Sequence, residues 1–361
     1  GQEQWTAYAE GPVRLPPVGW HDRVYFGSDD GTLYCVAAED GKLIWKFHGA
    51  PNAQQVIGNQ RLISAWPARG GPVLRDGCVY FSASIWPFMG TFIYALDAES
   101  GKIVWLNDST GAEYIKQPHS APSFAGVAPQ GALVATDDAL IVPGGRSVPA
   151  VLDRATGRQR YFELNAGGKG TGGSFVAANN DFFFVHTREK GTRSFNIANG
   201  LKTAFMPNEP VLAGGIIYSA ESVEGQPMVR AYGADEQLIW EIAADGRGDL
   251  ILAGDRLLAA GAEGITAIRL PGEGRAAEVV AQLSGYPGIE RLLAADNKLF
   301  AVTLDGRILA FGDDGSDRVA AASERSEVEL SSTDTETASD SSGRSNDGSY
   351  SGSTVNRPFT I

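Results

Sequence analysis

The amino-acid sequence predicts an all-β fold, a β-propeller of seven four-stranded antiparallel blades, with eight blades as the alternative. Three observations lead to this prediction. A short phrase recurs along the chain, hairpins built on acidic-Gly turns recur between its copies, and no segment shows a sustained 3.6-residue apolar period. Short strands repeated in units of this kind are typical of propellers, in which each blade packs against its neighbours.

The recurring phrase joins an acidic turn, a glycine and an aromatic residue four positions after the glycine. It reads AAEDGKLIWKF at 37–47 and LDAESGKIVWLND at 96–108, so Trp45 and Trp105 occupy equivalent positions. A third copy, LDRATGRQRYFEL, places Tyr161 where the tryptophan was. Because the phrase recurs in successive units, we interpret its aromatic residues as structural and look for a site elsewhere.

The hairpins recur around turns that contain an acidic residue and a glycine. RVYFGSDDGTLYCVAA (23–38) aligns without a gap on KLFAVTLDGRILAFGD (298–313), with Asp-Gly at the same place in both. Apolar and polar residues alternate around Asp-Gly, which is the strongest short-range signal for a tight hairpin. One strand precedes each hairpin and the aromatic-bearing strand follows it. Each unit therefore has four antiparallel strands, as a propeller blade does.

The units are expected at 14–47, 71–107, 131–164, 172–207, 209–243, 248–283 and 288–312. The last unit has only three strands, whereas the chain begins with an additional strand in GQEQWTAYAEG, which carries Trp5. We therefore expect the N-terminal strand to complete the last blade and close the ring, which leaves no open sheet edge. In the eight-blade alternative, this strand belongs to a further, incomplete blade.

The composition sets the domains and excludes some functions. We assign the propeller to residues 1–315 and an acidic, Ser-rich tail to 316–361, which has too few apolar residues to fold and is expected to be mostly disordered. The formal net charge of −13 argues against binding of nucleic acid, which requires a basic surface. No run of eighteen apolar residues is present, so no membrane span is expected.

The two cysteines do not indicate a metal site. Cys35 and Cys78 lie far apart, and the sequence has neither a CxxC motif nor a cluster of histidines and cysteines. They form either two thiols, which the frequent burial of cysteine favours, or one disulfide. The chain begins at Gly1 without a basic and apolar leader, so any signal peptide was removed or was not included.

The consensus A-x-D-x-x-[ST]-G-K-x-x-W resembles the repeat of the pyrroloquinoline-quinone (PQQ) type propellers. ALDAESGKIVW (95–105) matches it almost completely, VLDRATGRQRY (151–161) matches in part, and the resemblance extends to about residue 312. The resemblance implies that the aromatic residue of one blade docks on the turn of the next. The docking residues implied in this way are Trp5, Trp45, Trp105, Tyr161 and Trp240.

The resemblance implies two kinds of function. This repeat builds cofactor-dependent alcohol and sugar dehydrogenases, and also an outer-membrane assembly lipoprotein that binds no cofactor and serves as a protein-binding scaffold. The dehydrogenases carry adjacent cysteines beside the cofactor and a Glu, Asn and Asp set that holds calcium. This sequence has no adjacent cysteines and no CxxCH motif for a haem. We therefore expect no cofactor, no metal and no catalytic residue.

A binding site is expected on the loops at one end of the propeller. In a four-stranded meander, the turn between the second and third strands lies at the same end as the link to the next blade. The insertions fall in these connections of the first four blades, where long loops on a rigid scaffold favour binding. The candidate binding residues are Trp66, Arg69, Trp86, Phe88, Lys116, His119, Arg146 and Lys169, and His186 lies in a loop of the same class.

Each of these residues also has a structural interpretation. Trp66 and Trp86 could plug the mouth of the propeller, whereas Arg69 and Arg146 could satisfy loop carbonyls or pair with acids. His119 has no partner that the sequence identifies. The triplet Arg-Gly-Asp at 247–249 falls in a link between blades, and we interpret it as chance.

These observations favour a non-catalytic propeller, monomeric and exported from the cytoplasm. Its decorated face would bind a protein partner, or a polymeric or small ligand. The alternative is a quinoprotein-type oxidoreductase, or the propeller domain of a larger enzyme, that holds PQQ with calcium. In that alternative the quinone would lie over Trp86 and contact Arg69 or Arg146.

Overall fold

The computed structural model describes residues 3–58, 60–117, 121–145, 147–162, 171–187, 191–312 and 359–360. Within these ranges the regular structure is β-strand, apart from the short 3₁₀ helix η1 (Pro87–Met89). The expected all-β fold is therefore confirmed. No helix in this part of the chain could cross a membrane. Apart from 359–360, the tail predicted at 316–361 lies outside the described residues.

The first three large sheets are antiparallel meanders of consecutive strands. The first has β2 (Val18–Trp20), β3 (Arg23–Gly27), β4 (Thr32–Ala37) and β5 (Leu43–His48). The second has β8 (Gly70–Arg75), β9 (Cys78–Ala83), β10 (Phe92–Asp97) and β11 (Ile103–Asn107), and the short β14 (Gly131–Ala132) adds to β8 in parallel. The third has β15 (Val134–Ala135), β16 (Ala139–Val142), β17 (Ala150–Asp153) and β18 (Gln159–Tyr161).

The later sheets repeat the same order of strands. They are β19 (Thr171–Ala178), β20 (Phe182–Thr187), β21 (Thr192–Asn196) and β22 (Lys202–Met206), then β23 (Val211–Ala213), β24 (Ile216–Val223), β25 (Gln226–Tyr232) and β26 (Leu238–Ala243). Next come β27 (Asp249–Ala253), β28 (Arg256–Gly261), β29 (Gly264–Arg269) and β30 (Glu278–Ser284), and last β31 (Ile289–Ala295), β32 (Lys298–Thr303) and β33 (Ile308–Gly312).

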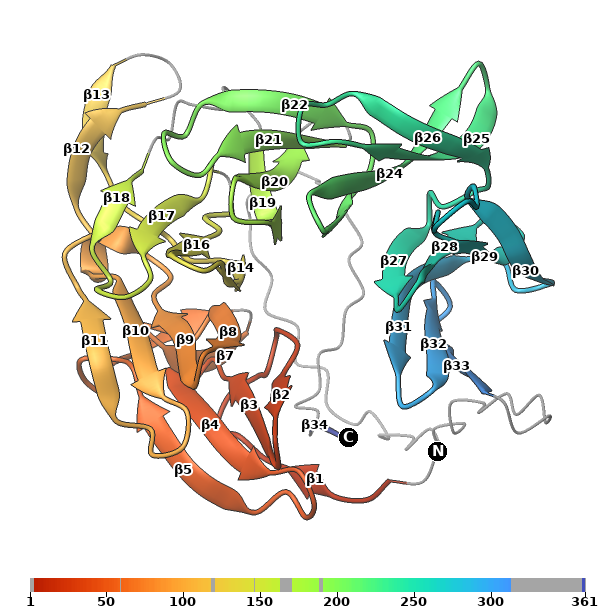
Figure 1. Ribbon diagram of the computed structural model, residues 1–361. Helices are drawn as coiled ribbons and strands as arrows, with labels where there is room; N and C mark the ends of the chain where they lie inside the picture. Colours follow the sequence, from red (N-terminus) through yellow and green to blue (C-terminus); the bar gives the residue numbers. More distant parts are fainter. Residues whose placement is uncertain are drawn as a thin grey trace, which may run out of the picture.

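The sheets follow one another around a central axis, as Figure 1 shows. The N-terminal strand β1 (Thr6–Ala7) pairs antiparallel with β34 (Phe359–Thr360), and the three-stranded sheet β31–β33 gains no partner from it among the described residues. The pairing therefore does not show β1 completing the last sheet. The number of blades and the closure of the ring stay predictions.

The apolar core lies mainly between neighbouring sheets. One cluster joins Tyr25 and Leu33 of the first sheet to Phe81 and Leu96 of the second. Similar clusters join the second sheet to the third and the third to the fourth. Both cysteines are free thiols, and burial raises the pKa of the Cys35 thiol. Since each core is shared by two sheets, each sheet depends on its neighbour for stability.

The aromatic residue of the recurring phrase lies on the glycine turn of the next sheet. The indole of Trp105 covers Gly157 and donates its Nε1–H to the carbonyl oxygen of Arg154, at 3.0 Å. Trp45 makes the same contact with Gly101 and donates to Ala98 O at 3.2 Å. These glycines have φ near +70°, a conformation that other residues adopt at a cost.

Two further aromatic residues make corresponding contacts. Trp5 covers Gly41 and donates to Ala38 O at 2.8 Å, while the Tyr161 ring covers Gly200 and its hydroxyl donates to Ile197 O at 2.9 Å. Trp240 packs beside Tyr218, with ring centroids 6.0 Å apart, in a cluster that includes Leu270 of the next sheet. Trp5 therefore lies against the first sheet in the same way that Trp45 lies against the second.

A comparison of two glycine substitutions tests this contact. In Gly157→Ala the new Cβ would overlap Trp105 Cε3, whereas in Gly254→Ala no atom lies within 4 Å of the new Cβ. Both glycines have positive φ, so both variants bear a backbone cost of about 1 kcal/mol. We expect Gly157→Ala to lose about 2 kcal/mol more than Gly254→Ala in urea unfolding, because only Gly157→Ala displaces the indole. Equal losses would show that the indole does not depend on the turn.

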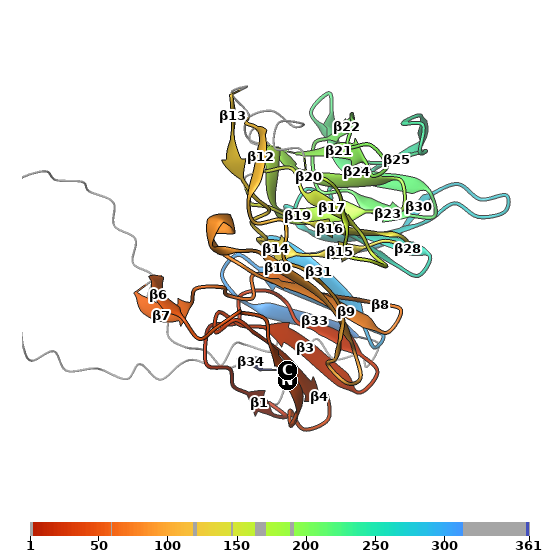
Figure 2. The same ribbon diagram turned by 90° about the vertical axis from the view of Figure 1, so that its left-hand side faces the viewer.

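Two small hairpins stand outside the large sheets. They are β6 (Gln55–Gly58) with β7 (Arg61–Ser64), and β12 (Glu113–Lys116) with β13 (Pro122–Ala125). Figure 2 shows both hairpins projecting from the same end of the molecule, where η1 also lies. Both hairpins lie within the predicted insertions, but their strands were not predicted, because they lie outside the recurring pattern that identified the others.

Candidate functional site

Six large apolar side chains are exposed on the projecting elements, and we call this group the apolar rim. Phe88 is 79% exposed on η1, and Tyr114 and Phe124 are 64% and 75% exposed on the β12–β13 hairpin. The Trp86 and Phe88 rings stack at 6.3 Å, and the Tyr114 and Phe124 rings meet edge to face at 5.3 Å. The rim consists of Ile57, Leu62, Trp86, Phe88, Tyr114 and Phe124.

The elements that carry the rim are held by local contacts. Pro87 stands at the first position of η1, where its fixed φ favours a helical turn, and Gly90 ends the turn with φ of 106°. The buried Trp66 donates its Nε1–H to Met89 O at 2.9 Å and meets Phe92 edge to face. The buried Trp66 therefore holds η1 on its inner side, while Trp86 is about half exposed to solvent.

The guanidinium of Arg69 is engaged by a buried acid. Its Nε and Nη2 atoms both lie 3.1 Å from the carboxylate oxygens of Asp29, and Arg14 Nε lies 2.5 Å from the same carboxylate. Asp29 is 1% exposed and the Arg69 side chain 17% exposed. This two-point pair matches the interpretation in which Arg69 pairs with an acid, and it leaves few donors for a ligand.

The remaining candidates are distributed differently from the prediction. Lys116 is exposed on β12, next to the rim. His119, Arg146 and Lys169 lie outside the described residues. His186, at the end of β20, stacks on Phe175 with ring centroids 4.9 Å apart and lies beside a cavity that the sequence analysis did not identify.

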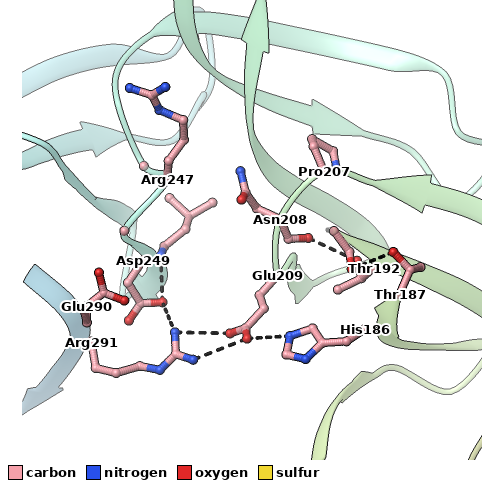
Figure 3. A pocket seen from close by; sticks show the side chains of 14 residues that line it. His186, Thr187, Thr192, Pro207, Asn208, Glu209, Arg247, Asp249, Glu290 and Arg291 are labelled. Carbon is pink, nitrogen blue, oxygen red and sulfur yellow. Dashed lines mark hydrogen bonds and ion pairs between the residues drawn. The ribbon is translucent and has the colours of Figure 1, made fainter. Parts of the chain in front are cut away.

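This cavity, of about 500 Å³, is formed by the fourth to the last sheets (Figure 3). Its walls come from the β20–β21 turn, the link after β22, the link after β26, and the beginnings of β27 and β31. These connections lie at the end predicted to hold the site. They belong, however, mostly to later repeats than the first four in which we expected it.

Glu209 is the centre of a group of polar contacts on the cavity wall. Its Oε1 lies 2.8 Å from His186 Nε2, and its two carboxylate oxygens each lie 3.3 Å from the Arg291 guanidinium. Burial acts to raise the pKa of Glu209, but the hydrogen bond with His186 and the charge of Arg291 outweigh it, so the pKa is lowered. Glu209 is therefore ionised at neutral pH.

Two further charged residues line the cavity, Asp249 and Arg247, and Arg247 is paired with an acid outside the lining. Burial raises the pKa of Asp249, whose carboxylate accepts the backbone N–H groups of Leu250 at 2.9 Å and Leu292 at 2.7 Å. Arg247 is held by Asp245 through two contacts of 2.8 and 2.9 Å, and the hydrogen bonds from Arg247 lower the pKa of Asp245 to about 2. The charge of Arg247 is thus already neutralised.

This cavity does not fit PQQ with calcium. Glu209 and Asp249 are joined by the guanidinium of Arg291, and no group of three His, Cys, Asp or Glu side chains in the described ranges could hold a metal ion. The cavity lining includes no tryptophan, tyrosine or phenylalanine on which a planar quinone could stack. Arg69 is paired with Asp29, so of the two arginines in the quinone hypothesis only Arg146, which lies outside the described residues, is left untested.

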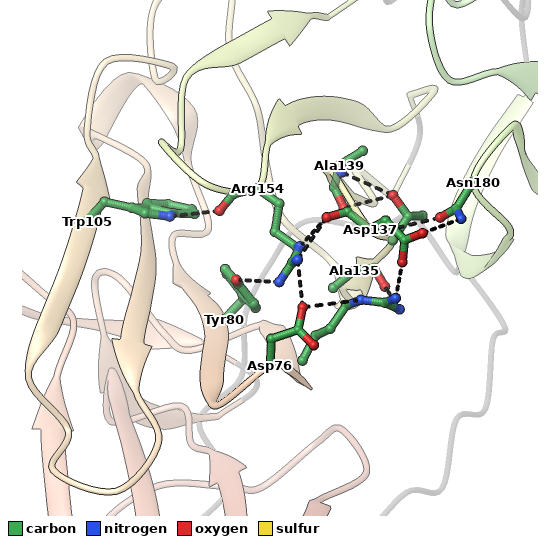
Figure 4. A network of polar contacts seen from close by, with 10 residues as sticks. Asp76, Tyr80, Trp105, Ala135, Asp137, Ala139, Arg154 and Asn180 are labelled. Atoms are coloured by element: carbon green, nitrogen blue, oxygen red, sulfur yellow. Dashed lines mark hydrogen bonds and ion pairs between the residues drawn. The ribbon is translucent and has the colours of Figure 1, made fainter.

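A second polar network, drawn in Figure 4, lies at the turns between first and second strands and between third and fourth strands, the ends of the sheets opposite to the cavity. Arg154 donates to Asp76 Oδ2 at 2.7 Å, to Asp137 O at 2.8 Å and to the Tyr80 hydroxyl at 3.3 Å. Asn180 donates to Asp137 Oδ2 at 2.6 Å. These residues come from turns of the second, third and fourth sheets and satisfy one another, so we assign the network to the coupling of sheets.

Comparison with known proteins finds quinone alcohol dehydrogenases and a BamB structure among the similar proteins. A stretch of 87 residues is 36% identical to the dehydrogenase subunit of a quinone alcohol dehydrogenase from Gluconobacter oxydans (strain 621H), and 34% identical to that from Gluconacetobacter polyoxogenes. Each match covers 24% of this chain and only 11% of the relative's length. The structure of BamB from Moraxella catarrhalis superposes with a TM-score of 0.51 at 14% identity over 87% of both chains, which is a likeness of fold alone.

The family comparison is broader. The model of the family described as outer membrane protein assembly factor BamB matches residues 1–228, more than half of the chain. The resemblance to PQQ-type propellers inferred from the recurring phrase is therefore confirmed. This chain is a β-propeller that belongs to the outer membrane protein assembly factor BamB family.

Proposed function

We propose that this protein is a non-catalytic scaffold that binds a partner protein through the apolar rim. The observation that carries this proposal is the exposure of six large apolar side chains on three projecting elements at one end of the molecule. Exposed apolar patches of this kind mark interaction surfaces, and aromatic residues contribute much of the binding energy at such surfaces. Arg69 and Glu209 are each paired with another charged side chain, which supports a binding role rather than a catalytic one.

The family description supports a location and a class of partner. A factor of outer membrane protein assembly works with other proteins of the cell envelope, so we propose an extracytoplasmic location and an envelope protein as partner. We propose that the protein acts as a monomer, as the sequence analysis expected. The rim includes two of the predicted binding candidates, Trp86 and Phe88, and a third, Lys116, lies at its edge.

Substitution of the rim tests the proposal. We expect Phe88→Ser with Phe124→Ser to reduce the partner recovered by cross-linking in intact cells at least about tenfold, because aromatic anchors dominate such contacts. The control is Ile103→Ser with Val104→Ser on β11, two side chains that are 53% and 54% exposed away from the rim. Both variants should fold, as circular dichroism can check. Equal recovery of the partner with the two variants would contradict the proposal.

A quinoprotein-type oxidoreductase, or a propeller domain of one, is the second candidate. The stretch that is 36% identical to an alcohol dehydrogenase subunit favours it. Its test is to mix the purified protein with PQQ and calcium and to measure dye reduction with alcohols or sugars. Activity that Arg146→Ala abolishes would overturn the scaffold proposal, whereas no bound quinone and no reduction would remove this candidate.

A further inference from the structure

The cavity of the later sheets contains a site already occupied by a guanidinium of the chain itself. Arg291 Nη1 lies 3.3 Å from Glu209 Oε2 and Nη2 lies 3.3 Å from Glu209 Oε1, so the fork of the guanidinium faces the fork of the carboxylate. Asp249 Oδ1 lies 3.8 Å from the same Nη1 (Figure 3). The structure therefore shows directly which kind of group these two carboxylates accept.

Arg291 is held loosely in this position. Close ion pairs of arginine and carboxylate have N···O distances of about 2.7–2.9 Å, and all the contacts of Arg291 with these acids are longer. Its side chain is 59% exposed, whereas those of Glu209 and Asp249 are 26% and 12% exposed. More than half of the Arg291 side chain therefore already faces solvent.

The two carboxylates keep their positions without Arg291. Glu209 is also held by His186 at 2.8 Å, and Asp249 by the backbone N–H groups of Leu250 and Leu292. Departure of Arg291 would leave two fixed, largely buried carboxylates on the cavity wall. Uncompensated charges of this kind are costly, so the site favours another cation in the place of Arg291.

The rest of the cavity supports the same ligand class. Glu290 adds a third carboxylate to the lining, and the charge of Arg247 is taken up by Asp245. The volume of about 500 Å³ lies in the range of small-ligand sites, and it exceeds what one side chain needs. We propose that this cavity binds an organic cation, a guanidinium or primary ammonium group, between Glu209, Asp249 and Glu290, with Arg291 as the internal group that it displaces.

This binding goes beyond the scaffold function, because none of its residues belongs to the apolar rim. The cation can come from a free amine or from a basic side chain of a partner. Calorimetric titration of the full chain with agmatine tests the first source, and titration with the peptide Gly-Arg-Gly tests the second. Both peptides carry an acetyl group at the N-terminus and an amide at the C-terminus, so Gly-citrulline-Gly, which then has the same shape without any charge, is the matched control.

The expected result is binding of at least one cationic probe, weaker at higher salt, and no binding of the citrulline peptide. Binding of agmatine identifies a free amine as sufficient, and binding of Gly-Arg-Gly alone identifies a partner's side chain. Absence of binding by both, or equal binding of the citrulline peptide, would overturn the proposal. Rim variants should bind the probes unchanged, so this test succeeds or fails independently of the scaffold function.

Three substitutions locate the bound cation. Glu209→Gln and Glu290→Gln should each weaken probe binding, Glu209→Gln by about tenfold or more because that carboxylate is the more buried of the two. Arg291→Gln should strengthen binding, since the competing guanidinium is gone. Glu273→Gln, an exposed acid in the connection between β29 and β30, should change nothing. If Glu209→Gln proves unstable, Glu290→Gln carries the test, and unchanged affinity in that variant places the cation elsewhere.

Discussion

Trp105→Ala is expected to lower the free energy of unfolding by about 3–5 kcal/mol, the range for truncation of a buried tryptophan. The indole is 9% exposed, covers Gly157 and donates to Arg154 O at 3.0 Å. Its removal therefore opens a gap between the second and third sheets and leaves a backbone carbonyl without its donor. Urea unfolding followed by tryptophan fluorescence and circular dichroism measures the loss.

The neighbouring residue provides the control. Val104 lies on the same strand and is 54% exposed, so Val104→Ala should change stability by no more than about 0.5 kcal/mol. Trp45→Ala should behave like Trp105→Ala, since the two rings make equivalent contacts with successive sheets. An unchanged unfolding midpoint in Trp105→Ala would show that the contact with Gly157 does not join the sheets.

Asp29→Ala should cost about 3 kcal/mol, because it removes the shared partner of two arginines from a buried position. The carboxylate is 1% exposed and accepts Arg14 at 2.5 Å and Arg69 at 3.1 Å. Its loss leaves two guanidinium groups to find water inside the loops between the first and second sheets. Thermal unfolding at low and high salt would measure the effect.

An exposed acid serves as the comparison for Asp29. Asp255 is 70% exposed and lies 3.7 Å from Arg256, so Asp255→Ala should change stability by no more than about 0.5 kcal/mol. If Asp29→Ala were equally mild, the buried acid would not hold Arg69 in place. Arg69 would then be available to a ligand, as the loop hypothesis first suggested.

Most of the fold could be predicted from the sequence because its strands repeat. Asp30-Gly31 and Asp305-Gly306 mark turns in which the glycine has positive φ, 87° and 84°, so their hairpins were evident without tertiary information. The hairpins β6–β7 and β12–β13 were missed, since each occurs once and no second copy supported it. The partner of β1 was also not predictable, because the two-residue pairing with β34 depends on long-range position alone.

The sequence indicated the loop-bearing end of the propeller and two residues of the rim, Trp86 and Phe88, but none of the residues that line the cavity except His186. Loop length drew attention to the early repeats, where Trp66 and Arg69 proved to be engaged by Met89 and Asp29. Arg247 and Asp249, dismissed as a chance triplet, line the cavity. The links that contain Glu209 and Asp249 are short and carry no unusual motif. Only the packing of four successive sheets brings His186, Glu209, Asp249 and Arg291 together.

The docking of Trp45 and Trp105 has a consequence for how this protein can change over time. The glycine turns that receive these rings connect the third and fourth strands of each sheet, at the end opposite to the hairpins and the cavity. Insertions at the rim end therefore leave the joints between sheets untouched. Changes in the loops at the rim end can therefore create contacts with new partners, while the docked aromatic residues at the other end continue to join the sheets.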